Sequence, residues 1–363
     1  MRILFVIDQL VGGGAAKKLV LLANALSSRG HSMAIATNTY KPIAYHISEN
    51  VSLNNIYNKD SYKKNRIIRF LSVRSSLRKL VSRTSPDVVV SVLPHVSFFV
   101  KLSLLGMKVP IVFSDETSFA RKDRLLIHFI RHYFYNVADA VVVLTENDIK
   151  ILGKNIPKKV AIHNPVDCPR YNKNSVSKEK IILAIGPLAE WDIKGFDLLF
   201  KAFKPLADLF PDWKIAIAGD SKEPYKSIVE GLIKDCHLDG RVELLGFQTN
   251  IFGVMAKSSI YALSSRIEGF SLSLVEALSQ GCACLAFENY GVIDEVSRGG
   301  KGVLTVKDGD VEGFSKQLCR LIYSPEERIR LAEEGKSVVS AYDLDKIATQ
   351  WENLFTRLSG NTH

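Results

Sequence analysis

The chain has 363 residues, 47% of them hydrophobic and 24% charged, a composition that suits two α/β domains and excludes a disordered protein. No stretch of about 18 apolar residues is free of charge, so the sequence predicts no transmembrane helix. The net charge of +10 is uneven: residues 1–180 carry 28 Lys and Arg against 12 Asp and Glu. This basic first half predicts an anionic partner. The five cysteines are odd in number, which fits a reducing cytoplasm, and no pair has zinc-finger spacing, so the sequence predicts no metal site among them.

In the first half, nearly continuous apolar runs alternate with amphipathic stretches. The apolar runs predict parallel strands buried on both faces, at residues 2–7, 32–37, 87–93, 111–115 and 140–145. The amphipathic stretches predict helices at 15–30, directly after three glycines, and at 66–83. Repeated strand–helix–strand units indicate a doubly wound, Rossmann-like α/β domain, which we assign to residues 1–165.

A polar segment without periodicity then predicts an interdomain linker over residues 166–179. After it the strand–helix alternation starts again. Apolar runs predict strands at 180–186, 213–220, 242–247, 258–265, 283–288 and 301–306. We therefore predict a second Rossmann-like domain over residues 180–343. The remaining residues, 344–363, predict an amphipathic helix that can cross back to the first domain.

The strongest local signal lies between a predicted strand and a predicted helix, at residues 264–281. Glu268 and Glu276 are eight positions apart, and Ser271 or Ser273 can cap the helix that follows. The free amide groups at the start of a helix suit a phosphate. Both carboxylates can then line one pocket and accept hydrogen bonds from sugar hydroxyls. The alternative is that both are ordinary solvated charges.

This segment resembles the Glu-x7-Glu signature of glycosyltransferase family 4, whose members have the GT-B fold of two Rossmann-like domains facing each other across a cleft. The resemblance implies that Glu276 holds the nucleotide ribose and that Glu268 lies at the donor sugar as a catalytic residue. It also implies donor contacts along the intervening main chain. The matching positions are Ser264, Ser265, Arg266, Glu268, Gly269, Phe270, Glu276, Ala277 and Gly281, and the implied donor contacts also include Ser271 and Leu272. Ser271 stands where many members have proline.

A second segment, residues 186–203, resembles the family's G-R-L…K-G-x-D-x-L pattern. Lys194 falls on the lysine that binds the donor diphosphate, where a point cation can offset the charge of the leaving group. Pro187 stands where most members have an arginine, so that phosphate contact is missing or is supplied elsewhere. The alternative for Lys194 is a surface residue at the start of a helix.

Two further sites are predicted in the first domain. Gly13 and Gly14 resemble part of the family's G-G-A-E-R loop, which implies main-chain contacts to the donor, although Ala16 and Lys17 replace the acid and the arginine. At the end of the strand 111–115, Asp115 and Glu116 are candidates for a residue near the acceptor, and we favour Glu116 as catalytic. The alternative is a pair of helix-capping acids.

Basic residues interleave with apolar ones over residues 63–83 and again over 121–134. Helices of this kind can lie on anionic lipid, although a solvated basic face is the alternative. No nucleic-acid motif accompanies them. The histidines, including His95, show no metal-ligand spacing and are expected to be structural.

The resemblance implies a retaining glycosyltransferase that moves a hexose or N-acetylhexosamine from a nucleotide sugar, most commonly UDP-linked in the family, without a metal or other cofactor. The expected acceptor is a lipid-linked glycan of bacterial lipopolysaccharide, O-antigen or capsule synthesis. The expected location is cytoplasmic, at the inner face of the plasma membrane. The alternatives are a related nucleotide-sugar epimerase or hydrolase, a non-enzymatic nucleotide- or membrane-binding module, and, weakest, a dehydrogenase.

Overall fold

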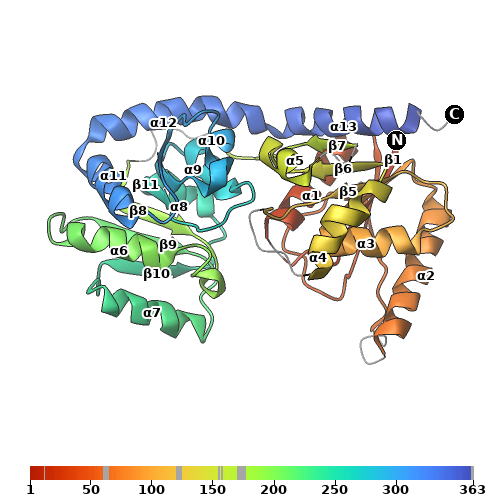
Figure 1. Cartoon of the computed structure of the whole chain (residues 1–363), viewed down its shortest axis with the longest axis horizontal. Helices are drawn as coiled ribbons and strands as arrows, with labels where there is room; N and C mark the ends of the chain where they lie inside the picture. The colour runs from red at the N-terminus through yellow and green to blue at the C-terminus, as the bar shows by residue number, and fades with distance from the viewer. Residues whose placement is uncertain are drawn as a thin grey trace. The chain divides into compact units, whose positions relative to one another are not determined.

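The computed structural model describes residues 1–11, 13–59, 65–119, 125–153, 156, 158–169 and 177–360. The chain forms two compact units (Figure 1). The first unit contains Met1–Pro165 together with Asp343–His363, and the second contains Val166–Tyr342. Some residues named in the sequence analysis lie outside the described residues. They are Gly12 of the three-glycine turn, and Lys63, Lys64 and residues 121–124 of the predicted basic stretches.

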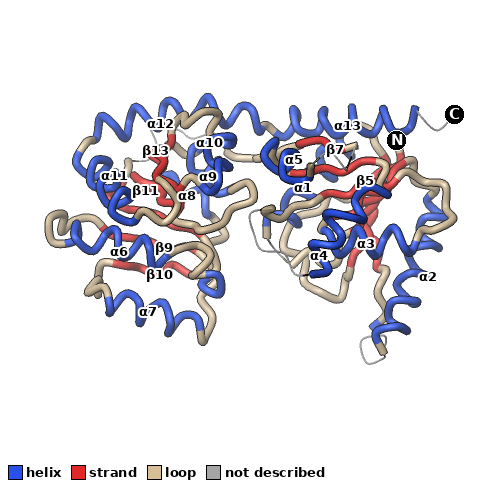
Figure 2. The backbone as a smooth tube through the Cα atoms, viewed as in Figure 1, coloured by secondary structure: helices blue, strands red, loops and turns tan. Residues whose placement is uncertain are grey.

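The first unit contains a seven-stranded sheet in the order β3-β2-β1-β4-β5-β6-β7, with every described strand pair parallel. Figure 2 shows the strands in red and the helices in blue. The five strands expected from apolar runs are confirmed. The edge strands β3 and β7 were not predicted, because their partly exposed residues form no continuous apolar run. The strands are β1 (Arg2–Val6), β2 (Ser32–Thr37), β3 (Val51–Asn55), β4 (Val88–Val92), β5 (Ile111–Ser114), β6 (Ala140–Val143) and β7 (Lys159–Ala161).

Helices cover both faces of this sheet, as the alternation of buried side chains along its strands requires. Ile3 and Phe5 of β1 pack into one core with α1 and α13, whereas Leu4 and Val6 pack into a second core with α2 and α3. The helical segments are α1 (Gly14–Ser28), α2 (Arg66–Thr84), α3 (Pro94–Ser103), α4 (Leu125–Phe129), the π-helix η2 (Ile130–Phe134), η3 (Tyr135–Val137), α5 (Glu146–Leu152) and α13 (Leu344–Gly360).

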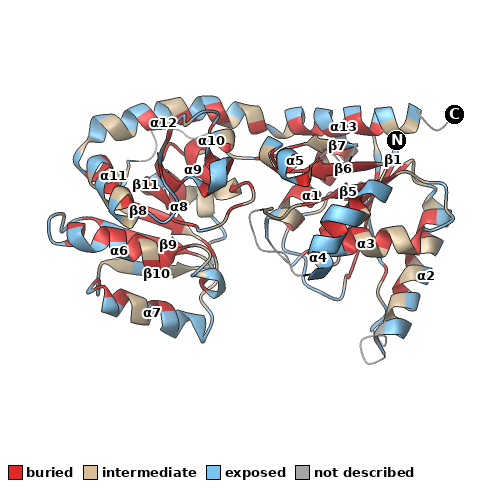
Figure 3. Cartoon of the chain, in the orientation of Figure 1, coloured by how far each residue is buried: buried red, intermediate tan, exposed pale blue. Residues whose placement is uncertain are grey.

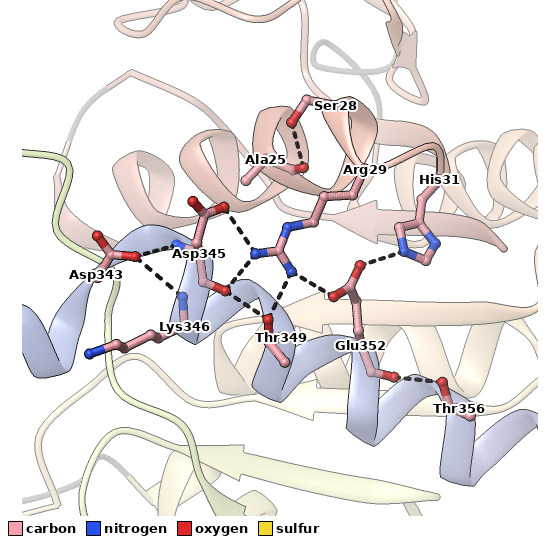
Figure 4. Close-up of polar contacts among 10 residues, drawn as sticks. All are labelled: Ala25, Ser28, Arg29, His31, Asp343, Asp345, Lys346, Thr349, Glu352 and Thr356. Atoms are coloured by element: carbon pink, nitrogen blue, oxygen red, sulfur yellow. Dashed lines mark hydrogen bonds and ion pairs between the residues drawn. The ribbon is translucent and has the colours of Figure 1, made fainter.

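The last helix, α13, is fastened to the end of α1 by polar contacts (Figure 4). Arg29 donates hydrogen bonds to Glu352 Oε2 at 2.6 Å and to Asp345 Oδ1 at 2.9 Å, and His31 Nε2 lies 2.9 Å from Glu352 Oε1. On the buried side of α13, Trp351 is 1% exposed. The C-terminal helix is therefore a structural part of the first unit.

The second unit contains a six-stranded parallel sheet in the order β10-β9-β8-β11-β12-β13, in which β11 and β12 are buried at every position (Figure 3). All six strands expected in this half of the chain are confirmed. The strands are β8 (Glu179–Ile185), β9 (Lys214–Ala218), β10 (Val242–Gly246), β11 (Ser258–Leu263), β12 (Ala283–Phe287) and β13 (Val303–Val306).

Helices follow the strands of this second sheet in turn, and pairs of them pack together: α6 against α11, and α9 against α12. This alternation is the doubly wound pattern that the sequence predicts. The helical segments are η4 (Leu188–Glu190), α6 (Phe196–Ala207), α7 (Tyr225–Asp235), α8 (Ile251–Lys257), α9 (Leu272–Ser279), η5 (Asn289–Gly291), α10 (Val292–Val296), α11 (Val311–Tyr323), α12 (Pro325–Val339) and η6 (Ser340–Tyr342).

Candidate active site

A pair of opposite charges lies beyond the two central strands of the second sheet. From β8 the chain proceeds to β9 and β10 on one side, and from β11 it proceeds to β12 and β13 on the other. Strand ends at such a switch point form a ligand-binding crevice in doubly wound sheets. Lys194 follows β8 and Glu268 follows β11, and Lys194 Nζ lies 3.0 Å from Glu268 Oε1. The structure thus brings two sequence-predicted residues into direct contact.

The environment of this pair keeps the lysine charged. The Glu268 side chain is 8% exposed and that of Lys194 is 21% exposed. Burial favours a lower pKa for the Lys194 ammonium, but the charge of Glu268 and its hydrogen bond outweigh burial and raise the pKa above its usual value. A permanent cation is therefore available at this point in the crevice.

Hydrogen bonds between the two loops hold the pair in place. The Ser264 hydroxyl donates to the carbonyl oxygen of Lys194 at 3.0 Å, and the Arg266 amide donates to Ile193 O at 2.8 Å. The Arg266 guanidinium donates to both carboxylate oxygens of Asp197, each at 2.8 Å. Burial alone would raise the pKa of Asp197, but these hydrogen bonds hold it below the usual value. Sequence reasoning missed this positioning role, although Arg266 itself was part of the resemblance.

Three glycines allow the backbone segments beside the pair to approach closely. A Cβ on Gly195, which has a φ of +64°, would lie 2.0 Å from Ser264 O. A Cβ on Gly219, at the end of β9, would lie 1.9 Å from Gly186 O. A Cβ on Gly186 would meet Lys194 Cγ at 2.7 Å. The glycines therefore set the path of the lysine stem.

The expected serine cap of α9 is wrong. Ser271 occupies the N-cap position in a left-handed conformation with φ 58°, and its side chain makes no capping hydrogen bond. Its Oγ atom is buried and has no hydrogen-bond partner within the described protein. Ser273 is occupied elsewhere, because its Oγ accepts a hydrogen bond from Tyr261 at 2.7 Å. The first amides of α9 thus lack a side-chain acceptor, and such a helix start suits an anion.

The other predicted donor contacts lie on the same segment. Gly269, Phe270 and Leu272 flank Ser271, and Glu276 is the fifth residue of α9, 7% exposed. The Phe270 ring is buried and packs edge-on against Tyr342, with ring centroids 5.2 Å apart. Because this ring is buried, the predicted donor contact of Phe270 is one that its main chain would make.

In the first unit, Gly13 and Gly14 lie at the start of α1, with Gly13 as its N-cap at φ 88°. Glu116 lies under this helix, where its Oε1 accepts hydrogen bonds from Lys18 Nζ and Ser114 Oγ, both at 2.6 Å. The Lys18 and Glu116 side chains are only 4% and 1% exposed. Glu116 is therefore held in a buried ion pair.

The neighbouring acid, Asp115, has a structural role. It is fully buried and accepts hydrogen bonds from Arg131 Nε, the Tyr135 hydroxyl and Thr117 Oγ1. Burial and the nearby carboxylate raise the pKa of Tyr135 well above its usual value. Asp115 thus anchors η2 and η3 to the end of β5.

One histidine expected to be structural lies instead in a crevice. His95 is the second residue of α3, its side chain is 51% exposed, and its Nε2 lies 3.5 Å from Asp8 Oδ2. Its position just after β4 is the signal that could have identified it, since ligand-binding residues gather at strand ends. Among the described residues no group of three His, Cys, Asp or Glu side chains could hold a metal ion.

Matches to known protein families together span nearly the whole chain. A family model described as Glycosyltransferase Family 4 matches residues 12–170, and one described as Glycosyl transferases group 1 matches residues 170–338. An uncharacterized glycosyltransferase of Haemophilus influenzae is 27% identical over 349 residues, which span 94% of this chain and 96% of the relative.

Two further relatives carry more specific names. The Campylobacter jejuni GalNAc-α-(1→4)-GalNAc-α-(1→3)-diNAcBac-PP-undecaprenol α-1,4-N-acetyl-D-galactosaminyltransferase is 25% identical over 369 residues, 99% of each chain. The crystal structure of Anabaena HepE in complex with UDP matches with a TM-score of 0.78 at 16% identity, covering 98% of this chain and all of that one.

Proposed function

The chain belongs to glycosyltransferase family 4 and has the GT-B fold, and from that premise we propose the reaction that this glycosyltransferase performs. It transfers a hexose or N-acetylhexosamine from a UDP-sugar, with retention of configuration, to a lipid-linked glycan of a bacterial surface polysaccharide such as lipopolysaccharide, O-antigen or capsule. The observation that carries the proposal is the Lys194–Glu268 pair at the switch point of the second sheet, beside the start of α9.

In this proposal the second unit binds the donor. The diphosphate lies between Lys194 and the first amides of α9, and Glu276 accepts hydrogen bonds from the ribose. As the glycosidic bond breaks, negative charge grows on the leaving phosphate, and a fixed ammonium and amide dipoles stabilise it. Uridine is the proposed base because HepE, which shares the fold, was crystallised with UDP.

The phosphate-binding groups imply transfer without a metal ion. Lys194 supplies the positive charge that a cation would otherwise provide, so we expect turnover to be unchanged by a chelator such as EDTA. Loss of turnover in EDTA, restored by a divalent cation, would contradict this part of the proposal.

The acceptor is proposed to be lipid-linked because the first unit offers a basic, partly apolar surface. Ile67, Ile68 and Leu71 of α2 are 66%, 50% and 51% exposed. Leu125 and Leu126 of α4 are 91% and 54% exposed. Helix α3 contacts both α2 and η2, which continues α4, so these helices are neighbours in the unit. Apolar side chains among basic ones suit the inner face of an anionic plasma membrane.

Vesicle binding tests the proposed membrane contact. Ile67→Ser with Leu71→Ser should reduce sedimentation with phosphatidylglycerol-containing vesicles, whereas Leu209→Ser, at an exposed leucine of the second unit, should not. Equal binding by all variants would contradict the contact. Among the described residues, no helix combines the length and the apolar content needed to cross a bilayer.

A thermal-shift screen of nucleotide sugars tests the donor assignment, since a ligand that binds the folded state raises Tm by mass action. We expect one UDP-sugar to raise Tm and Lys194→Ala to abolish the rise. Product analysis with a lipid-linked glycan should then show an α- or β-linkage that matches the anomer of the donor. Donor consumption at the same rate without an acceptor would instead indicate an epimerase or hydrolase.

A further inference from the structure

A cavity of about 490 Å³ opens in the first unit, beyond the carboxyl ends of β1 and β4. From β1 the chain proceeds to β2 and β3, and β4 leads to β5 on the other side, so this is the switch point of the first sheet. Helices α2 and α3 form its further walls, since Arg69, Phe70 and Phe99 line the cavity. The volume is in the range of small-molecule sites.

The two strand ends place a polar pair in this cavity. Asp8 follows β1 and His95 follows β4, with His95 Nε2 3.5 Å from Asp8 Oδ2. Their side chains remain 35% and 51% exposed, so both can reach a ligand. The Lys194–Glu268 pair occupies the equivalent place in the second unit, beyond β8 and β11. Each sheet thus presents a polar pair where a doubly wound fold binds its ligand.

The charge of the lining favours an anion. Besides the Asp8–His95 pair, the charged side chains at the cavity are Lys41 and Arg69, both cations. Lys41 is exposed, and no ion pair of Lys41 occurs among the residues that the structure describes. Two cations and one carboxylate give the described side chains of this lining a net positive charge.

Aromatic rings form the apolar part of the wall. Phe70 of α2 and Phe99 of α3 meet edge-on, with centroids 5.4 Å apart and planes at 89°. Tyr57 adds a third ring. Ring faces beside dispersed hydrogen-bonding groups suit a sugar, whose faces are apolar and whose edges carry hydroxyls.

We propose that this cavity binds the acceptor through an acidic sugar, one that carries a phosphate or a carboxylate. The anion lies against Lys41 and Arg69, the sugar ring packs against Phe70 and Phe99, and Asp8 and His95 bind hydroxyls. The sugar's role as acceptor rests on the proposed glycosyl transfer, whereas its binding here does not.

Binding of simple sugars to the full chain tests the assignment without turnover. The probes are glucose 6-phosphate, glucuronate, glucose and inorganic phosphate, measured by calorimetry or by ligand-observed NMR. One of the two acidic sugars should bind at least about tenfold more tightly than glucose, because a charge-assisted hydrogen bond is worth about 1.4 kcal/mol or more. Glucose 6-phosphate and glucuronate together show whether the anion is a phosphate or a carboxylate.

Matched variants locate the binding. Lys41→Ala should weaken binding of the acidic sugar about tenfold. Lys79→Ala, at an exposed lysine of α2 that does not line the cavity, should leave the affinity for the sugar unchanged. Asp8→Asn should raise the acceptor KM without changing donor affinity. Equal binding of glucose, equal binding of inorganic phosphate, or equal weakening by Lys79→Ala would overturn the proposal.

The donor site provides the remaining control. If Lys194→Ala abolishes binding of the acidic sugar, the sugar occupies the second unit and the proposal is wrong. If Lys41-dependent binding persists while no nucleotide sugar supports transfer, the proposed function fails and the acidic-sugar site stands. The two failures are thus distinguishable.

Discussion

Replacing Gly186 with alanine should reduce catalysis while leaving the fold intact. The new Cβ would lie 2.7, 3.1 and 3.3 Å from Cγ, Cδ and Cε of Lys194. Carbon atoms in contact prefer about 3.5–4.0 Å, so the lysine stem must move by roughly 1 Å. The Nζ atom, now 3.0 Å from Glu268, then loses its place at the proposed diphosphate.

The magnitude follows from that displacement. A shift of about 1 Å in a catalytic group can cost roughly a hundredfold in rate, and removing one charge-stabilising donor costs about 10²–10³ in kcat. We expect kcat/KM of Gly186→Ala to fall about 30- to 100-fold, because the displaced Lys194 ammonium keeps part of its interaction with the leaving phosphate. Stability should fall by about 1 kcal/mol, the lower end of the range for overpacking, because the atoms nearest the new Cβ belong to a side chain and not to backbone.

The assay compares kcat/KM and Tm of three alanine variants, with the UDP-sugar that raises Tm most as donor. Gly231→Ala, inside α7, is the matched control, since apart from its chain neighbours and the backbone of its own helix no atom lies within 4 Å of the added Cβ. Gly219→Ala is the opposite case, because its Cβ would meet Gly186 O at 1.9 Å. It should lose about 3 kcal/mol of stability. Parental kcat/KM in Gly186→Ala, or a Tm loss equal to that of Gly219→Ala, would refute the reasoning.

Three further predictions concern stability, each measured by urea unfolding. Burial raises the pKa of Asp148 from 3.8 to about 6, so the folded state favours the protonated acid and stability falls as pH rises through 6. Asp148→Asn should therefore gain about 2 kcal/mol over the parent between pH 4.5 and pH 8, and a constant difference would contradict this. Trp351→Ala should lower the free energy of unfolding by about 3–5 kcal/mol, because it empties a buried site. Asn353→Ala, on the exposed face of α13, should lower it by less than about 0.5 kcal/mol. Similar losses in the two variants would show that α13 is not docked through Trp351. Arg266→Ala, which leaves Asp197 only the more distant Lys201 ammonium at 3.6 Å, should cost about 1–2 kcal/mol, and no loss would contradict the positioning role of Arg266.

The central strands of both sheets could be predicted from the sequence because they are buried on both faces. Such strands are continuous apolar runs, and β4 and β12 are buried at every position. The edge strand β3 has mostly exposed or half-exposed residues, and β7 is three half-exposed residues long. Their pairing is set by the neighbouring strand rather than by their own composition, so pattern alone does not reveal them.

The candidate site was predictable where a motif is local and hidden where contacts are distant in sequence. Glu268 and Lys194 were identified through short segments that resemble a family. Their 3.0 Å contact joins positions 74 residues apart, which no pattern shows. Similarly, the burial of Glu116 against Lys18 joins positions 98 residues apart. Ser271 was predicted as a side-chain cap from residue type, but its backbone is left-handed and its side chain makes no capping hydrogen bond, neither of which the residue type reveals.

The place of α13 determines the order in which this chain can finish folding. The first unit's core needs Trp351 and Phe355, which are synthesised after every residue of the second unit. During translation, one face of the sheet in residues 1–165 therefore remains partly uncovered until α13 has been synthesised. Val166–Tyr342 contains the whole second unit, so this unit can fold before α13 emerges. A protein that ends at Pro165 would leave exposed the apolar side chains that α13 normally covers, and it should aggregate unless residues 343–360 are joined to it.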